Sequence, residues 1–176
     1  MFNMAKPIKF LLQTQRKPFR IAILAYEECM GTEVFGLIDV LLIAAHLADH
    51  MAKTQVGVGF PPFDVQLVGL AGRTVTVAGG IAVGVKQPRG VFDLLVVPGP
   101  EVGRRGVWDA RLAPLSAELA FIKKTFARGA QVASVCAGTF LLGEAGLLGD
   151  RKVTTAWIFA KELAQRYPTA KVNAEA

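Results

Sequence analysis

The sequence predicts an α/β fold, in which an open and mostly parallel sheet carries helices on both faces as a three-layer sandwich. Short apolar runs alternate along the chain with longer segments whose apolar residues recur at helical spacing. The runs that we interpret as strands are almost continuously apolar, which is typical of parallel strands covered on both faces. The chain has 176 residues, enough for one hydrophobic core and too few for two domains.

The first half of the chain opens on an apolar run, Phe19–Tyr26, which predicts the first strand. In the segment 32–52, the apolar side chains share one face of a helix. An alternating pattern over Phe63–Leu70 predicts the second strand. The segment Arg73–Val85 contains two short β-like pieces around Gly79-Gly80, and it therefore predicts a small β-hairpin insertion.

The second half continues the alternation of strands and helices. The elements that we expect there are, in order, a strand over Phe92–Pro100, a helix over Ala113–Arg128 ended by Gly129, a strand over Ala130–Cys136, a helix over Ala137–Leu148, a short strand over Lys152–Thr155, a helix over 156–167 and the beginning of a strand over Ala170–Ala176. No covering element follows this last β segment. We therefore expect a basic leader over residues 1–18 and one domain over residues 19–176 that is truncated at its C-terminal end.

The net charge is +6, and most of it lies near the N-terminus. Five basic residues and no acid occur in the first twenty positions, namely Lys6, Lys9, Arg16, Lys17 and Arg20. Such an arm could contact nucleic acid or an anionic surface, or it could be a solvated tail. The remainder of the chain is close to neutral, so its charge does not predict a partner.

The sequence predicts a soluble, cytoplasmic protein. Its two cysteines, Cys29 and Cys136, do not make a disulfide framework, and no secretory signal precedes the first strand. No apolar run reaches the ~18 residues that a membrane helix needs. His46 and His50 are spaced to share one helix face, but no third metal ligand is evident. We therefore expect no metal, no cofactor and no contact with a membrane.

The segment around Cys136 has the pattern of a nucleophile elbow. A strand runs directly into the cysteine, and the small residues Ala137 and Gly138 open an apolar helix. The helix N-terminus could lower the pKa of the thiol and hold an oxyanion. The alternative is a buried structural cysteine, which is common in apolar strands.

Four segments of the chain resemble the ThiJ/PfpI family, within the class I glutamine amidotransferase-like superfamily. They are "FRIAILAYEE", "GTEVFGLIDVL", "FDLLVVPG" and "VASVCAGTFLLGEAGLLGDRKVTTAW", and together they cover most of the chain from about Arg20 onward. The last segment is similar in particular to the N-terminal sensory domain of AraC-type transcriptional regulators. The resemblance implies a flavodoxin-like fold and assembly into homodimers.

The resemblance also implies roles for individual residues. Cys136 matches the family's elbow cysteine, Glu33 matches an acid that approaches it, and Gly99 matches a loop glycine that supplies a backbone donor. The family's histidine follows the cysteine by twenty positions, and here that position is Ala156. Pro100 replaces a second loop glycine and has no N–H to donate. The pocket that we expect is therefore formed by Glu33, Gly99, Pro100, Cys136, Ala137 and Ala156.

Three functions follow from this pattern. The first is the effector-sensing domain of an AraC-type regulator, which would bind a small molecule and contact DNA only through a helix-turn-helix domain that this chain lacks. The second is a ThiJ/PfpI-type cysteine hydrolase, or an enzyme similar to isonitrile hydratase, in which Cys136 and Glu33 carry the chemistry. The third is redox sensing through oxidation of Cys136. The missing histidine favours the first, because a hydrolase needs a group that moves the thiol proton.

Overall fold

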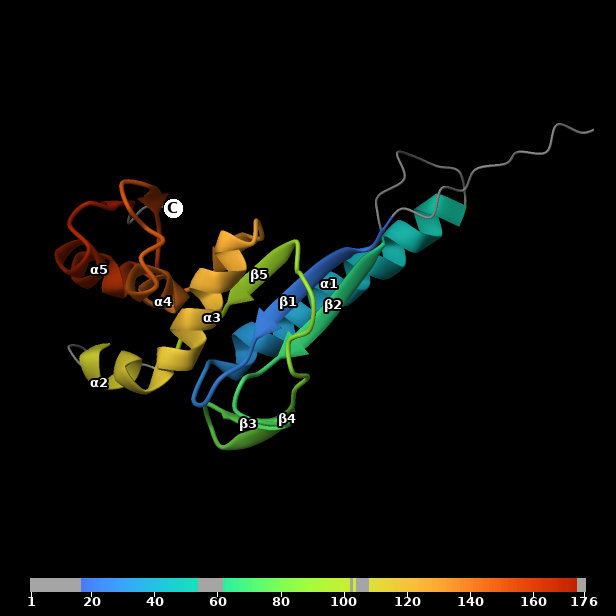
Figure 1. The fold of residues 1–176 in the computed structure, drawn as a ribbon, viewed down its shortest axis with the longest axis horizontal. Coiled ribbons are helices and arrows are strands. Elements are labelled where there is room, and N and C mark those ends of the chain that lie inside the picture. Colours follow the sequence, from blue (N-terminus) through green and yellow to red (C-terminus); the bar gives the residue numbers. More distant parts are fainter. Residues whose placement is uncertain (1–16, 54–61, 102, 104–107, 174–176) are drawn as a thin grey trace, which may run out of the picture.

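The computed structural model describes residues 17–53, 62–101, 103 and 108–173, and Figure 1 shows their arrangement. Its centre is a sheet of four parallel strands in the order β2-β1-β5-β6. These strands are β1 (Phe19–Leu24), β2 (Phe63–Val68), β5 (Leu94–Val97) and β6 (Gln131–Ser134). The expected open, parallel α/β sheet is confirmed, and the carboxyl ends of all four strands lie at one edge.

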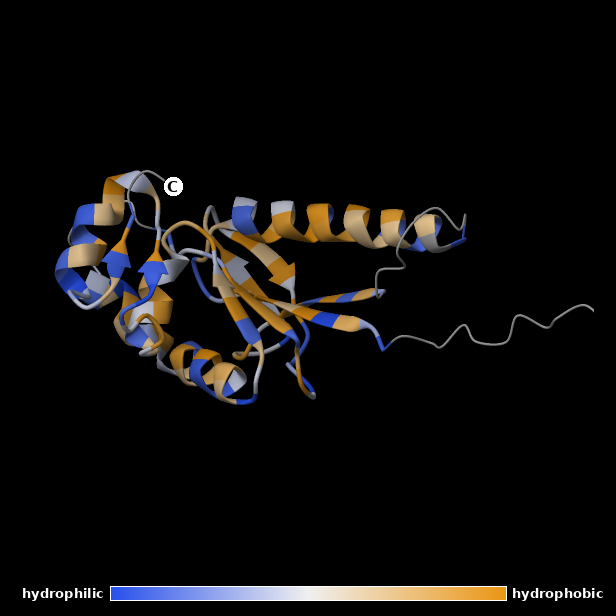
Figure 2. Ribbon diagram, turned by 90° about the horizontal axis from the view of Figure 1, so that it is seen from above, coloured by the Kyte–Doolittle hydropathy of each residue, from blue (hydrophilic) through white to orange (hydrophobic). Residues whose placement is uncertain are grey.

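Helices cover both faces of this sheet. The helix α1 (Gly31–Lys53) lies along one face, while α3 (Ser116–Ala127) lies on the other, as the two views in Figures 1 and 2 show together. Alternate side chains of β1 serve the two faces: Ile21 and Ile23 pack in a cluster with α1, and Leu24 packs in the larger cluster that contains Ile122 of α3. This alternation explains why the strands are apolar at nearly every position.

The inserted hairpin is also present where the sequence predicts it. It consists of β3 (Thr74–Val77) and β4 (Ile81–Gly84), which pair antiparallel. Gly79 and Gly80 connect them with φ values of 87° and 78°. The connection has three residues, beginning with Ala78, and both glycines adopt the left-handed region that glycine occupies without strain.

The C-terminal third contains short elements. They are α4 (Gly138–Glu144), β7 (Lys152–Val153), the 3-10 turn η2 (Trp157–Phe159), α5 (Ala160–Arg166) and β8 (Lys171–Val172). The strands β7 and β8 form a separate parallel pair and do not join the main sheet. The helix after Cys136 ends earlier than expected, because the chain turns at Gly146 with a φ of 75°.

One helix was not expected from the sequence. It is α2 (Trp108–Leu112), which leads through the 3-10 turn η1 (Ala113–Leu115) into α3. The Trp108 ring stacks on Phe140 of α4 with centroids 3.5 Å apart, and its indole N–H donates to Glu162 of α5 at 2.6 Å. These tertiary contacts attach α2 to the C-terminal part of the domain.

The long helix α1 passes a test of length and hydropathy for a membrane span over Gly31–Met51. The expectation that no segment is apolar enough is therefore wrong on composition. Length and composition alone are weak evidence, because core helices and signal sequences share them. Here Leu37, Ile38 and Leu41 pack against the sheet, although only 11% of the apolar window is buried. His46 and His50 are exposed on this helix, and no group of three or more metal-ligating side chains occurs among the described residues.

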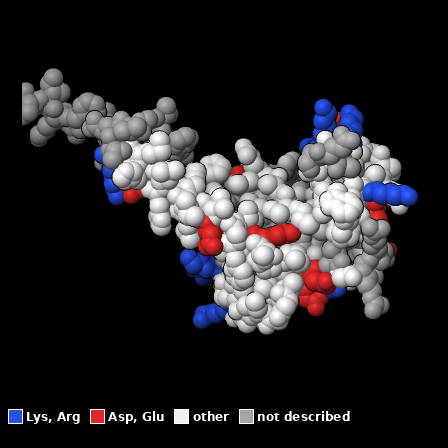
Figure 3. All heavy atoms as spheres, turned by 180° about the vertical axis from the view of Figure 1, so that it is seen from behind, with Lys and Arg blue, Asp and Glu red and all other residues white. Residues whose placement is uncertain are grey.

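One expectation lies mainly, and another partly, outside the described residues. The basic leader over residues 1–18 is described only at Lys17 and Pro18, and the last three residues of the expected C-terminal strand are not described. On the face shown in Figure 3, basic and acidic side chains form small separate groups, and no broad patch of one sign is visible.

Candidate functional site

Cys136 lies at the carboxyl edge of the sheet, between β6 and α4. Its φ is 51°, a left-handed backbone conformation that non-glycine residues rarely adopt, and the residue is exposed. The turn needs a glycine two positions later, because a Cβ at Gly138 would overlap the Val97 carbonyl oxygen. The strand, the strained turn and the close backbone approach together present the cysteine side chain outward.

Hydroxyl groups hold the backbone of this turn. Thr155 Oγ1 donates to the Cys136 carbonyl at 2.9 Å, and Thr139 Oγ1 donates to the Thr154 carbonyl at 2.8 Å. Ser134 and Thr139 hydroxyls are also 2.9 Å apart. The two threonines before Ala156 therefore fix the following segment against the cysteine turn, a role that sequence reasoning did not assign to them.

Glu33 reaches the same turn from the first turn of α1. The Gly99 N–H donates to Glu33 Oε2 at 2.6 Å, and the Glu33 carboxylate and the Cys136 thiol lie close enough for each to shift the pKa of the other. Burial raises the pKa of Glu33, while the bonds from Gly99 and Cys136 lower it in part. The carboxylate thus connects the loop after β5 with the cysteine after β6.

The pKa of the Cys136 thiol is raised from its ordinary value. The largest cause is desolvation of the sulfur, although the residue as a whole is exposed, and the next is the negative charge of Glu33. The N–H groups of Ala137 and Ala156 lower the pKa only in part. The expectation that the helix N-terminus lowers the thiol pKa is therefore wrong in its net direction, because burial and Glu33 outweigh the backbone donors.

Ala156 brings its backbone, and not a titratable ring, to the sulfur. Its N–H lies close enough to Cys136 to lower the pKa of the thiol in part, and its side chain is a methyl group. Both histidines of the chain lie on α1, and His46 is roughly 20 Å along the helix axis from Glu33 at 1.5 Å per residue. No imidazole therefore reaches the cysteine within the described part of the chain.

The loop after β5 offers few donors to a reacting group. The Gly99 N–H is occupied by Glu33, and the Gly99 carbonyl accepts from the Met30 N–H at 2.9 Å. Pro100 has no N–H at all. A Cβ at Gly99 would lie 3.1 Å from the Ala137 nitrogen, so the loop packs directly on the cysteine turn.

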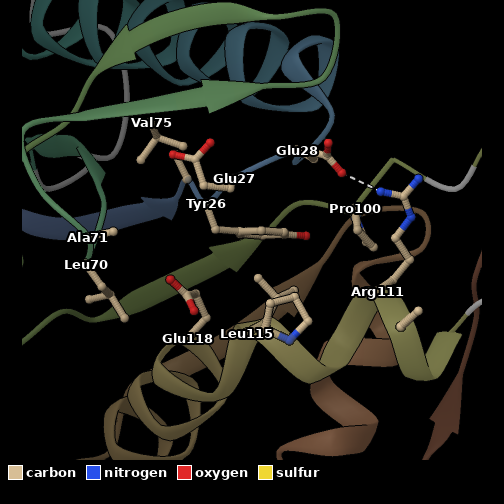
Figure 4. Close-up of a pocket in the computed structure, with 13 residues that line it drawn as sticks. Tyr26, Glu27, Glu28, Leu70, Ala71, Val75, Pro100, Arg111, Leu115 and Glu118 are labelled. Atoms are coloured by element: carbon tan, nitrogen blue, oxygen red, sulfur yellow. Dashed lines mark hydrogen bonds and ion pairs between the residues drawn. The ribbon is translucent and has the colours of Figure 1, made fainter.

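The sequence-predicted residues fall into two places. Glu33, Gly99, Cys136 and Ala137 meet at the cysteine turn, where the Ala156 N–H also arrives. Pro100 instead lines a neighbouring cavity of about 410 Å³, shown in Figure 4, to which none of the other predicted residues contributes.

The chain is thus an open parallel α/β protein that presents a cysteine, with an adjoining glutamate, at the carboxyl edge of its sheet. The model of the DJ-1/PfpI family matches residues 19–175, and the chain belongs to that family.

Other comparisons agree on the fold. A candidate transcriptional regulator from Vibrio parahaemolyticus is similar with a TM-score of 0.69 at 21% identity, over 91% of this chain and 78% of that one. An AraC family transcriptional regulator from Pseudomonas putida is similar with a TM-score of 0.59 at 20% identity, over 89% of this chain and 76% of that one.

One curated relative matches in sequence. It is an uncharacterized protein in the cpoL 5' region of Streptomyces lividans, 49% identical over 47 residues. The match covers 27% of this chain and 33% of that protein. It therefore spans about a third of the relative's length and assigns no activity.

Proposed function

We propose that this chain is the effector-sensing domain of an AraC-type transcriptional regulator, with a degenerate amidotransferase-like pocket. The observation that carries the proposal is that a backbone N–H of Ala156, and no imidazole, faces the Cys136 thiol. The similarity in fold to two structures described as transcriptional regulators supports the same assignment.

The arrangement at Cys136 is poor for hydrolysis. A nucleophilic cysteine needs a base that removes its proton and a donor that returns one to the leaving group. Here the thiol pKa is raised and Glu33, the nearest acid, increases it further. Loss of the base of a catalytic triad commonly costs several powers of ten in rate.

The oxyanion contribution is reduced as well. The Gly99 N–H is bonded to Glu33, and Pro100 cannot donate. Each preorganised donor of this kind is worth about 2.7–4 kcal/mol in an acyl-transfer transition state. The Cys136 turn therefore lacks free donors that acyl transfer would use.

In this proposal the chain responds to a small-molecule effector as a homodimer. The effector acts by binding two states of the domain with different affinities, which reorients an attached helix-turn-helix domain. This chain contributes the sensing part, and DNA contact belongs to the attached domain.

A hydrolase or an enzyme similar to isonitrile hydratase is the second candidate. The contact between Glu33 and Cys136 favours it, because a carboxylic acid beside a thiol can itself carry a proton. Substrates that need no histidine-dependent leaving-group protonation would suit such a pair.

The coding sequence downstream of Ala176 tests the proposed regulator. The proposal predicts that it encodes two helix-turn-helix motifs, and that the purified full protein binds duplex DNA from its own promoter region. The control is the same protein truncated at Ala176, which is expected to bind that DNA far more weakly. A coding sequence that ends shortly after Ala176, or a full protein without DNA binding, would contradict the proposal.

A further inference from the structure

We infer that the cavity beside the Cys136 turn is a binding site for a small organic ammonium ion, with Glu118 as the carboxylate that receives it. The inference rests on the side chains of this cavity alone. It does not depend on the proposed regulatory function, because none of the cysteine-turn residues Glu33, Gly99 and Cys136 lines the cavity.

The cavity has the size and shape of a small-molecule site. It measures about 410 Å³ and lies between the β1–α1 turn, the segment that leads into β3, and the α2–α3 region. Cavities that bind small ligands commonly begin near 300 Å³. Its walls are mainly apolar and include Leu70, Val75 and Leu115.

Glu118 is the unusual member of this lining. The residue is only 8% exposed, none of the described hydrogen bonds or ion pairs involves its carboxylate, and no described side-chain oxygen is both fully buried and unpaired, so the carboxylate opens onto the cavity. Figure 4 shows the carboxylate directed into the cavity, toward the side on which Tyr26 lies. A carboxylate on a mostly buried residue is ordinarily paired, so one that opens onto an apolar cavity is available to a ligand cation.

The position of Glu118 in α3 explains why an acid occurs there, but it does not explain why this acid is mostly buried. Glu118 lies in the first turn of α3, where the helix dipole favours acids. An acid that serves only the dipole can remain in solvent, as most first-turn acids do. A ligand cation would supply the missing partner of a carboxylate that is held inside.

The charges around the cavity select a cation. Glu27 lies across the cavity beside Val75 and accepts the Thr76 N–H at 3.2 Å. Arg111 lines the cavity too, but its guanidinium is paired with Glu28 and with Glu101, the latter at 2.5 Å. The positive charge of Arg111 is thus neutralised by these two acids. Glu118 and Glu27 then leave an excess of negative charge in the described lining.

The surroundings favour an ammonium group over a metal ion. Among the described residues no cluster of three or more histidine, cysteine or acidic side chains is arranged to hold a metal. A protonated amine needs one strong acceptor and an apolar wall for its carbon skeleton, and both are present. The Tyr26 hydroxyl donates to the Pro98 carbonyl at 2.6 Å, which fixes the aromatic ring as part of that wall.

Benzylamine and benzyl alcohol form a matched pair of probes. They have nearly the same shape, and only the amine is positively charged near neutral pH. Titration calorimetry on the wild-type chain is expected to show tighter binding of benzylamine than of benzyl alcohol. Amide chemical shifts in a nitrogen–proton correlation spectrum should move at Leu115 and Ala71, which line the cavity.

The variant Glu118→Gln keeps the shape and removes the charge. It should weaken benzylamine binding about 10- to 100-fold, the worth of one charge-assisted hydrogen bond, and leave benzyl alcohol binding unchanged. The control Asp150→Asn removes an exposed acid elsewhere and should change neither. Without ligand, Glu118→Gln should have a Tm equal to or above that of the wild type, because the substitution removes a charge from a mostly buried residue and breaks no described ion pair.

Three results would overturn the inference. They are equal binding of the amine and the alcohol by the wild-type chain, undiminished amine binding by Glu118→Gln, and a clear loss of Tm in that variant, which would show a structural role for the carboxylate. If the variant does not fold, the comparison of the two probes on the wild-type chain and the location of the shifted amides decide alone.

Discussion

The backbone N–H of Ala156 lies close enough to the sulfur of Cys136 to lower the pKa of its thiol in part, at the end of a segment that Thr155 ties to the same turn. In the proposed sensing domain, this amide lies where a hydrolase would need a base for the thiol. A neutral amide donor stabilises a thiolate in part, but it cannot accept the thiol proton as an imidazole does.

Restoring the ring tests whether the histidine is the only missing part. We expect Ala156→His to give no measurable amidase activity, because the Gly99 N–H stays bonded to Glu33 and Pro100 supplies no donor. The measurement is release of ammonia or amine from simple amides, with Ala156→His/Cys136→Ser as the matched blank. Turnover above that blank would show that the rest of the site is intact.

The charge of Glu33 should control the reactivity of Cys136. Since that charge raises the thiol pKa, Glu33→Gln should lower it and increase the rate of iodoacetamide alkylation at about pH 8. The pH profile of alkylation should therefore inflect at a lower pH in Glu33→Gln than in the wild type. The exposed acid variant Asp150→Asn should leave the profile unchanged, and an upward shift in Glu33→Gln would contradict the assignment.

Peroxide distinguishes the two cysteines. Cys136 is exposed and Cys29 is buried, so mild peroxide should oxidise Cys136 first, although slowly because its thiol is mostly protonated. Mass spectrometry of tryptic peptides gives the extent of oxidation at each site. Redox sensing through Cys136 would be excluded if Cys29 were oxidised to the same extent.

The cysteine turn should be intolerant of a side chain at Gly138. A methyl group there meets the Val97 carbonyl, so Gly138→Ala should lower the free energy of unfolding by about 2–4 kcal/mol. Gly36→Ala is the control, because a Cβ at this exposed helical site meets nothing within 4 Å and should stabilise the chain by ~0.5–1 kcal/mol. Urea unfolding followed by circular dichroism measures both, and equal effects would contradict the packing described.

Much of the fold could be predicted from local patterns. The four strands of the main sheet and the hairpin at Gly79-Gly80 follow from apolar runs and turn chemistry, which are properties of short segments. The helix α2 could not be predicted in this way. Its five residues are stabilised by the stacking of Trp108 on Phe140, which is a contact between segments distant in the sequence.

The candidate site also has features that the sequence predicts and features that depend on contacts between distant segments. The absence of an imidazole at position 156 can be read by counting, whereas the direction of the thiol pKa depends on the balance of burial, Glu33 and backbone donors. The cavity at Glu118 could not be predicted, because its walls come from several separate segments. Its only sequence signal is an acid in the first turn of a helix, which is common in helices of every kind.

The most direct test of the central claim is turnover at Cys136. Purified wild-type chain and Cys136→Ser would be compared on simple amides, isonitriles and α-oxoaldehydes. Product formation would be followed at high enzyme and high substrate concentration. A sensing domain predicts that neither protein forms product above the enzyme-free blank. Turnover by the wild type that Cys136→Ser abolishes would contradict it and establish the chain as an enzyme.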